Sequence, residues 1–171
     1  MNLEKEILKE HSKAQRDRIV AYVGSNSQRL SGLINIFLKG SHRTTQLASW
    51  PLSNVAEQYP ELIAPHLRKI IHNLKTPDLH DAVKRNTIRL LQFVEIPKHL
   101  HGTIADLCFS FLQNPKEPIA VRVFSMTVLV NLSKKVPELK RELLIILEDQ
   151  FPYEGPAYRS RARKILRELN A

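Results

Sequence analysis

A pattern of small and apolar residues recurs four times along the chain. From a starting residue, a small or polar residue follows at position +3 and apolar residues follow at positions +6 and +7. The four copies are Thr45–Ala48–Pro51–Leu52, Lys84–Thr87–Leu90–Leu91, Arg122–Ser125–Val128–Leu129 and Arg159–Ala162–Ile165–Leu166. Their starts lie 39, 38 and 37 residues apart. Spacings of three and four residues put these positions on one face of a helix, so the pattern predicts four copies of one helix.

A second apolar stripe lies between successive copies of the first. Its residues follow spacings of 4, 3, 1 and 3, as in Ile63, Leu67, Ile70, Ile71 and Leu74, and again in Leu100, Ile104, Leu107, Cys108 and Phe111. The remaining copies are Leu139, Leu143, Ile146 and Leu147, and an earlier partial one, Leu30, Leu33, Ile34 and Phe37. Two helical stripes that alternate along the chain predict a stack of helix pairs.

Prolines and polar residues mark the ends of these helices. Three joints between pairs have an apolar residue followed by proline and soon by leucine, at Pro60, Pro97 and Pro137. Proline at the first helical position loses no hydrogen bond, and it biases the preceding residue away from helix. We therefore expect helices at residues 2–23, 26–39, 42–58, 60–75, 79–95, 97–113, 118–135, 137–150 and 156–169. No stretch alternates with a period of two, so no strand is expected.

These helices predict an all-α fold, a right-handed α-α superhelix (α-solenoid) of about four helix pairs plus an N-terminal capping helix. One pair cannot bury its own apolar face, so neighbouring pairs must stack. We expect a single domain over residues 1–171, with the cap at 1–25 and repeats at 26–59, 60–96, 97–136 and 137–171. The phase of the stripes predicts that seven residues are buried: Leu67, Ile70, Leu91, Leu107, Leu129, Ile146 and Leu166.

The helix pairs resemble those of the HEAT-repeat family. In that family the first helix carries a Pro-x-Leu motif and a leucine stripe, as residues 60–74 do here, and the second opens with Val-Arg. The matching places hold Val83-Lys84, Val121-Arg122 and Tyr158-Arg159. The first pair departs from the pattern, because Thr44-Thr45 replaces Val-Arg and Pro51 falls inside the second helix. The resemblance covers residues 26–169 and implies the fold.

The resemblance also implies where a binding surface would lie. In the family, the residue that opens the second helix often bonds to a neighbouring repeat, which would make Lys84, Arg122 and Arg159 a structural ladder. The alternative is a row of cations that faces a ligand. Second helices usually line the concave side of helical solenoids, where extended ligands bind. The candidate binding residues on their outward stripe are Trp50, Arg85, Arg89, Asn131, Arg159, Arg163, Lys164 and Arg167.

Two features of this set favour binding, and each has a structural alternative. Arg159, Arg163 and Arg167 form one ridge without an acidic partner at i+4, but the solvated face of a capping helix would look similar. Trp50 precedes Pro51, which removes one hydrogen bond and should kink or break its helix. This tryptophan could stack on a base or fill a pocket of a partner, or it could belong to the core.

Composition and charge narrow the class of protein and partner. The chain of 171 residues is 43% hydrophobic and 25% charged, as globular proteins are. Its formal net charge of +9 favours acidic partners: nucleic acid, anionic lipid or acidic protein. The charged N-terminus lacks a signal-peptide pattern, and the longest apolar run, Leu143–Leu147, is too short to span a membrane. A lone Cys108 on an apolar stripe predicts a buried, inert thiol and a cytoplasmic location.

No motif points to catalysis, a metal ion or a cofactor. The seven histidines lack ligand spacing, the five glycines form no phosphate-binding loop, and no nucleophile elbow occurs. The leading hypothesis is a non-enzymatic scaffold that binds a macromolecule on its concave face. A protein is the first expectation for the partner, and dense charge on the end helices predicts a monomer or a weak dimer.

Two other functions come from the resemblance. Some HEAT-like proteins, notably alkylpurine DNA glycosylases, hold duplex DNA on a basic concave face, and the basic balance here favours nucleic-acid binding. Their catalytic aspartate matches no position in this chain, which leaves base excision poorly supported. Some short HEAT-like proteins carry lyase labels, including adenylosuccinate lyase. The Ser-rich signature loop of that enzyme, with its Met-Pro and Lys, has no counterpart here.

Overall fold

The computed structural model describes all of residues 1–171, and every element in it is a helix. The chain forms two compact units, Met1–Glu95 and Ile96–Ala171, called here the N-terminal and C-terminal units. Their boundary falls at the predicted joint between the second and third repeats. The predicted all-α fold of helix pairs that pack in chain order is confirmed, whereas the single domain stays a prediction.

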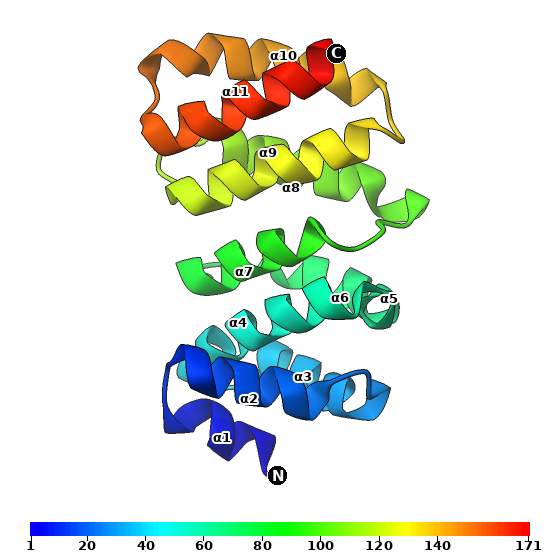
Figure 1. Cartoon of the computed structure of the whole chain (residues 1–171), viewed down its shortest axis with the longest axis vertical. Coiled ribbons are helices and arrows are strands. Elements are labelled where there is room, and N and C mark those ends of the chain that lie inside the picture. The colour runs from blue at the N-terminus through cyan, green and yellow to red at the C-terminus, as the bar shows by residue number, and fades with distance from the viewer. The chain divides into compact units, whose positions relative to one another are not determined.

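In the N-terminal unit, two short helices are followed along the chain by two complete helix pairs (Figure 1). Its elements are α1 (Leu3–Lys9), α2 (Lys13–Val23), α3 (Ser27–Lys39), α4 (His42–Gln58), α5 (Pro60–Ile63), the 3-10 helix η1 (Ala64–His66), α6 (Leu67–Asn73) and α7 (Asp81–Leu91). Helix α4 is central, because it packs against α1, α2, α3 and α7. Figure 1 shows α2, α4 and α7 one above another in this unit.

The C-terminal unit contains the last two pairs. Its elements are η2 (Lys98–Leu100), α8 (His101–Gln113), α9 (Ile119–Ser133), α10 (Glu138–Gln150), η3 (Phe151–Tyr153) and α11 (Pro156–Asn170). Here α9 takes the central place that α4 has in the other unit, since it packs against α8, α10 and α11. In both units the second helix of one pair therefore lies against the second helix of the next pair.

Side-chain bonds join the second helices within each unit. The buried Ser49 hydroxyl on α4 accepts a hydrogen bond from Asn86 on α7 at 2.9 Å, which satisfies two buried polar groups at once. On α9, Lys134 pairs with Glu168 of α11 at 3.0 Å. On α4, Glu57 pairs with Arg89 of α7 at 2.5 Å. Glu57 and Lys134 occupy the same position, +12, of their copies, but their partners Arg89 (+5) and Glu168 (+9) do not occupy equivalent positions.

The repeated pattern explains this packing. The residues at +3 have exposed fractions of 0–1%: Ala48, Thr87, Ser125 and Ala162. A small side chain at a fully buried position lets the neighbouring helix approach closely. Four of the seven predicted core residues are buried, namely Leu67, Ile70, Leu91 and Leu129. The other three, Leu107, Ile146 and Leu166, are half-buried. In α8, Cys108 next to Leu107 is fully buried, and in α10, Leu147 next to Ile146 is fully buried. Leu166 belongs to α11, the second helix of the last pair.

Three predicted helices are divided in the structure. The helix expected at 2–23 is two helices, because the Ser12 hydroxyl accepts a bond from the Gln15 amide at 3.0 Å and caps a new helix. The helix expected at 60–75 is interrupted by η1, since Pro65 has no amide hydrogen to donate. The helix expected at 97–113 opens with η2. Helix α7 starts later than predicted, after His80, whose ring nitrogen accepts a bond from the Ala82 amide at 3.0 Å.

Pro51 does not end its helix. Helix α4 has the predicted bounds, His42–Gln58, and continues through the proline without a break. The lost backbone bond is offset by packing, since Leu47, Leu52 and Val55 on either side of Pro51 are all buried. Tertiary contacts thus override the local preference at this position.

We expect Leu129→Ala to lower the free energy of unfolding by about 2–5 kcal/mol, through lost transfer energy plus the cavity left in the fully buried site. The matched control is Ile145→Ala on α10, where the side chain is 57% exposed and the loss should stay below about 1 kcal/mol. Urea denaturation followed by circular dichroism measures both. Equal losses in the two variants would show that the repeat pattern does not mark the core.

Candidate functional site

The candidate binding residues are distributed over both units. The N-terminal unit holds Trp50 on α4 and Arg85 and Arg89 on α7. The C-terminal unit holds Asn131 on α9 and Arg159, Arg163, Lys164 and Arg167 on α11. Arg85 and the four candidates on α11 are exposed, whereas Trp50, Arg89 and Asn131 are half-buried.

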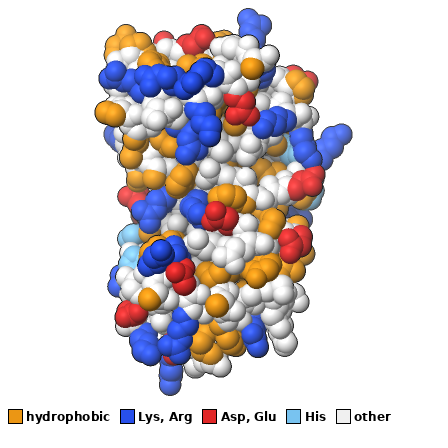
Figure 2. Space-filling view, in the orientation of Figure 1, with side chains coloured by type: hydrophobic (Ala, Val, Ile, Leu, Met, Phe, Trp, Pro, Cys, Tyr) orange, Lys and Arg blue, Asp and Glu red, His pale blue; other side chains and the backbone are white.

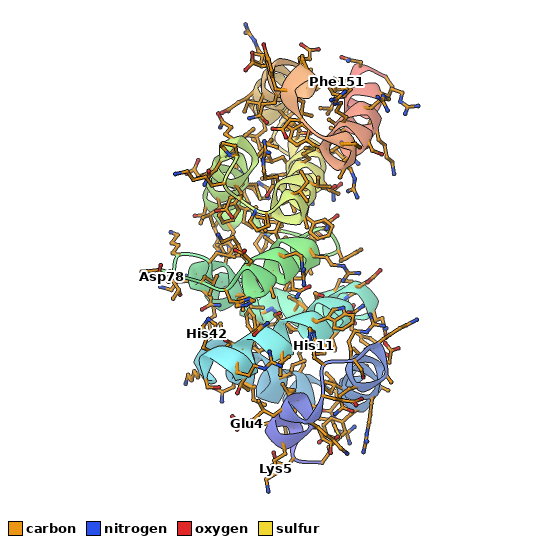
Figure 3. The ribbon with its side chains drawn as sticks, turned by 90° about the vertical axis from the view of Figure 1, so that its left-hand side faces the viewer. Glu4, Lys5, His11, His42, Asp78 and Phe151 are labelled. Atoms are coloured by element: carbon orange, nitrogen blue, oxygen red, sulfur yellow. The ribbon has the colours of Figure 1, made fainter.

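Trp50 packs against the segment that joins α1 to α2. The His11 ring meets its indole edge-on, with ring centroids 5.4 Å apart and an interplanar angle of 85°, and Figure 3 shows His11 beside α4. The Arg16 guanidinium lies 4.7 Å from the indole centroid, within the range of a cation–π contact. Trp50 therefore anchors the N-terminal helices on α4. Because His11 and Arg16 cover part of its indole ring, less of the ring can contact a partner.

Arg89 is also engaged within its own unit. Besides its ion pair with Glu57, it donates a hydrogen bond to the Ser53 hydroxyl at 3.2 Å, and its guanidinium lies 5.2 Å from the Phe93 ring centroid. These contacts hold α7 to α4 and neutralise the charge. Of the two α7 arginines, Arg85 is the exposed one.

The arginine ridge of α11 borders a groove between α10 and α11. This α10–α11 groove has a volume of about 540 Å³ and is lined by Glu148, Phe151, Pro152, Arg163, Leu166, Arg167, Asn170 and the terminal Ala171. Phe151 lies where α10 meets α11 (Figure 3), and Lys and Arg side chains gather over α11 in Figure 2. Arg163 and Arg167 thus face the outer side of the last helix pair.

The side of α11 that borders α9 carries different residues. Arg161 donates a hydrogen bond to the Thr127 hydroxyl, and Glu168 accepts the ion pair from Lys134. These contacts occupy the α9 side, so the residues at the groove come from another face of the helix. Lys164 is exposed but does not line the groove.

The groove combines an apolar floor with a cationic rim. Phe151, Pro152 and Leu166 supply the floor, and the Arg163 guanidinium lies 5.6 Å from the Phe151 ring centroid. Arg167 stands one turn further along α11 and donates a weak bond to the Arg163 carbonyl at 3.3 Å. A surface of this kind suits a ligand that offers both apolar groups and negative charge.

Phe151, Pro152 and Leu166 were not among the candidates from sequence. The pattern treated Phe151 and Pro152 as part of a break between helices, and it placed Leu166 in the core. The repeat pattern gave no signal that separates Leu166 from the buried leucines at the same position, although the structure leaves it half-buried at the groove.

Arg122 has a structural role, as the ladder interpretation proposed. Its buried guanidinium donates to the Leu112 carbonyl at 3.1 Å and to both carboxylate oxygens of Glu154, at 3.0 and 2.5 Å. It also lies 4.9 Å from the ring centroid of buried Tyr158, whose hydroxyl donates to Gln150. Burial raises the pKa of the Tyr158 hydroxyl. Arg122 thus connects the third repeat to the fourth.

The exposed Arg159 differs, since it donates only to the Glu154 carbonyl of its own repeat at 2.5 Å. Elsewhere, no group of three or more His, Cys, Asp and Glu side chains is arranged to hold a metal ion. None of the helices combines the length and the apolarity that crossing a bilayer requires.

Arg122→Ala should lower the free energy of unfolding by about 3–5 kcal/mol, because it leaves the Glu154 carboxylate partly buried without its partner. Arg159→Ala, at the equivalent exposed position of the next copy, is the control and should change it by less than about 0.5 kcal/mol. Chemical denaturation of both variants decides the matter. A small effect at Arg122 would refute its role as the connection between repeats.

The Cys108 thiol should not react with Ellman's reagent in the folded protein at neutral pH. Burial raises its pKa from 9.0 to about 12, against a smaller opposite effect of a hydrogen bond with Ser125. The neutral thiol therefore contributes stability that is complete below pH 9 and is lost as the pH rises towards about 12. The rate at which Cys108 reacts with the reagent is measured by absorbance before and after adding urea. A rapid reaction without urea would contradict the prediction.

Comparisons with known proteins place the whole chain in one family. No curated protein and no solved structure gives a significant match. A family model described as a HEAT repeat domain matches residues 3–169. Since the matched region spans both units and nearly all of the sequence, the chain belongs to the HEAT-repeat family of helical-repeat scaffolds.

Proposed function

We propose that this chain is a non-enzymatic interaction module that binds a protein partner, and that the α10–α11 groove is part of the binding surface. The observation that carries this proposal is the combination of an apolar floor and an arginine rim on the exposed side of the last helix pair. Protein interfaces are enriched in aromatic residues and arginine, and the groove offers Phe151, Arg163 and Arg167 together.

The concave face of the second helices was the surface expected from sequence, and it stays a prediction. Within the N-terminal unit, Trp50 is packed by His11 and Arg16, and Arg89 is paired with Glu57. Trp50 and Arg89 therefore have less free aromatic surface and less unpaired charge for contacts with a partner. The groove supports the proposal better, since its arginines have no ion pair with an acidic side chain of the chain itself.

Nucleic acid is the second candidate partner. The net charge of +9 and the exposed Arg85, Arg159, Arg163 and Arg167 favour it. The floor of the groove argues for a protein instead, because phosphates and sugars gain little from the apolar side chains of Phe151, Pro152 and Leu166.

Charge reversal at the groove tests the protein-binding proposal. Tagged full-length protein and the double variant Arg163→Glu/Arg167→Glu are cross-linked in cells, and the captured proteins are quantified after nuclease treatment. The control Arg85→Glu/Lys164→Glu changes the net charge equally on exposed residues outside the groove. We expect a partner that the wild type and the control capture equally and that the groove variant loses at least about tenfold. Equal capture by all three proteins would remove the groove from the binding surface.

A salt titration with short duplex DNA tests the second candidate. A genuine nucleic-acid surface that used the exposed arginines would make log K fall with log salt with a slope of about −3 to −5, since each neutralised duplex phosphate contributes about −0.9. Because we expect a protein partner, we expect no measurable DNA binding at moderate salt. A slope in that range that falls in the groove variant would establish nucleic-acid binding in its place.

A further inference from the structure

We propose that the α10–α11 groove binds an acidic amphipathic helix of the partner. This inference rests on the proposed function and specifies the chemistry of the bound segment. It follows from three properties of the groove: the element that covers the equivalent face elsewhere in the fold, the length of α11, and the sign of the charges along it.

A helix is the element that this fold places on its second helices. Within the N-terminal unit α7 packs on α4, and within the C-terminal unit α11 packs on α9. The leucines at position +7 of the first three copies, Leu52, Leu91 and Leu129, have exposed fractions of 0–2%. The equivalent Leu166 is half-buried and lines the groove. Leu166 therefore offers apolar surface in the groove that a docked helix can cover.

The groove fits a segment of three to four helical turns. Helix α11 has 15 residues, which corresponds to a length of about 22 Å. A partner helix of about 12–15 residues would lie along it, with apolar side chains at i, i+3 or i+4 and i+7 against the floor. Phe151, Pro152 and Leu166 supply the apolar area for that stripe.

The charges select an acidic helix. Arg163 and Arg167 are four residues apart on α11, so their guanidinium groups can meet two partner carboxylates that are also one turn apart. Glu148 is the only acidic residue that lines the groove. A basic helix would be repelled here, and a neutral one would leave both arginines unpaired.

A second copy of the chain fits this surface less well. A twofold interface built on the groove would bring Arg163 and Arg167 of one copy towards the same residues of the other copy. Like charges at close range disfavour that arrangement. Charge complementarity therefore favours a separate partner with carboxylates over self-association.

Binding of designed peptides to the full-length protein tests the inference. The probe is a fluorescein-labelled amphipathic helix with leucines at i, i+3, i+4 and i+7 and two glutamates, one turn apart, beside the stripe. Matched peptides carry glutamine or lysine in place of the glutamates. Fluorescence anisotropy measures affinity, and amide shifts in 15N spectra locate the site. We expect binding in the order Glu, Gln, Lys, with shifts centred on Arg163, Leu166 and Asn170.

Protein variants supply the matched control. Arg163→Glu/Arg167→Glu should weaken the glutamate peptide by about tenfold or more, since two exposed pairs are lost and replaced by repulsion. Arg85→Glu/Lys164→Glu should change its affinity by less than about twofold, because neither residue lines the groove. Added salt should reduce the preference for the glutamate peptide, since exposed charges are screened.

Four results would overturn the inference. They are the absence of groove-centred binding at millimolar peptide, equal affinity for the glutamate and lysine peptides, displacement of the peptide by duplex DNA, and a groove-dependent dimer in analytical ultracentrifugation. The first two leave the proposed function standing if the cross-linked partner still depends on Arg163 and Arg167. The inference and the proposed function fail together only if that dependence is also absent.

Discussion

Covering the second helix of each pair is the constraint on which the rest of the structure depends. A helix with buried residues at +3, +6 and +7 exposes too much apolar surface when only its own first helix covers it. In the N-terminal unit α4 is enclosed by α2, α3 and α7, and in the C-terminal unit α9 is enclosed by α8, α10 and α11. The small residues at +3 let neighbouring second helices approach closely. At this distance Asn86 can bond to Ser49, and Arg89 can bond to Ser53.

The same constraint explains why the candidate site lies where the pattern is left incomplete. Leu166 has the residue type and the repeat position of a core leucine, but it stays half-buried although α11 packs on α9, α10 and η3. Apolar surface therefore remains between α10 and α11, and the arginines of α11 border it. The groove thus combines a leucine of the repeat pattern with Phe151 and Pro152 of η3 and with the arginines of α11.

The sequence was sufficient for the architecture and insufficient for the roles of individual cations. Spacing alone predicted the helix pairs, the bounds of α4 and most of the core, because helical periodicity is a local property. Pro65 removes one backbone hydrogen bond and Ser12 adds a capping bond, and the apolar stripe predicts neither change. Trp50 was assigned to the core or the surface from residue type, whereas its half-buried state comes from His11 and Arg16, nearly 40 residues away in the chain.

Arg122 and Arg159 show why equivalent positions need not have equivalent functions. Both open a second helix, but Arg122 donates to Glu154 and Gln150 in the next repeat, whereas Arg159 donates to the Glu154 carbonyl of its own repeat. A buried arginine must be paired, so Arg122 is committed to stability. An exposed arginine at the last pair keeps its charge available for another molecule. Arg122 therefore holds the fold together, whereas the exposed arginines of α11 carry charges that a partner can contact.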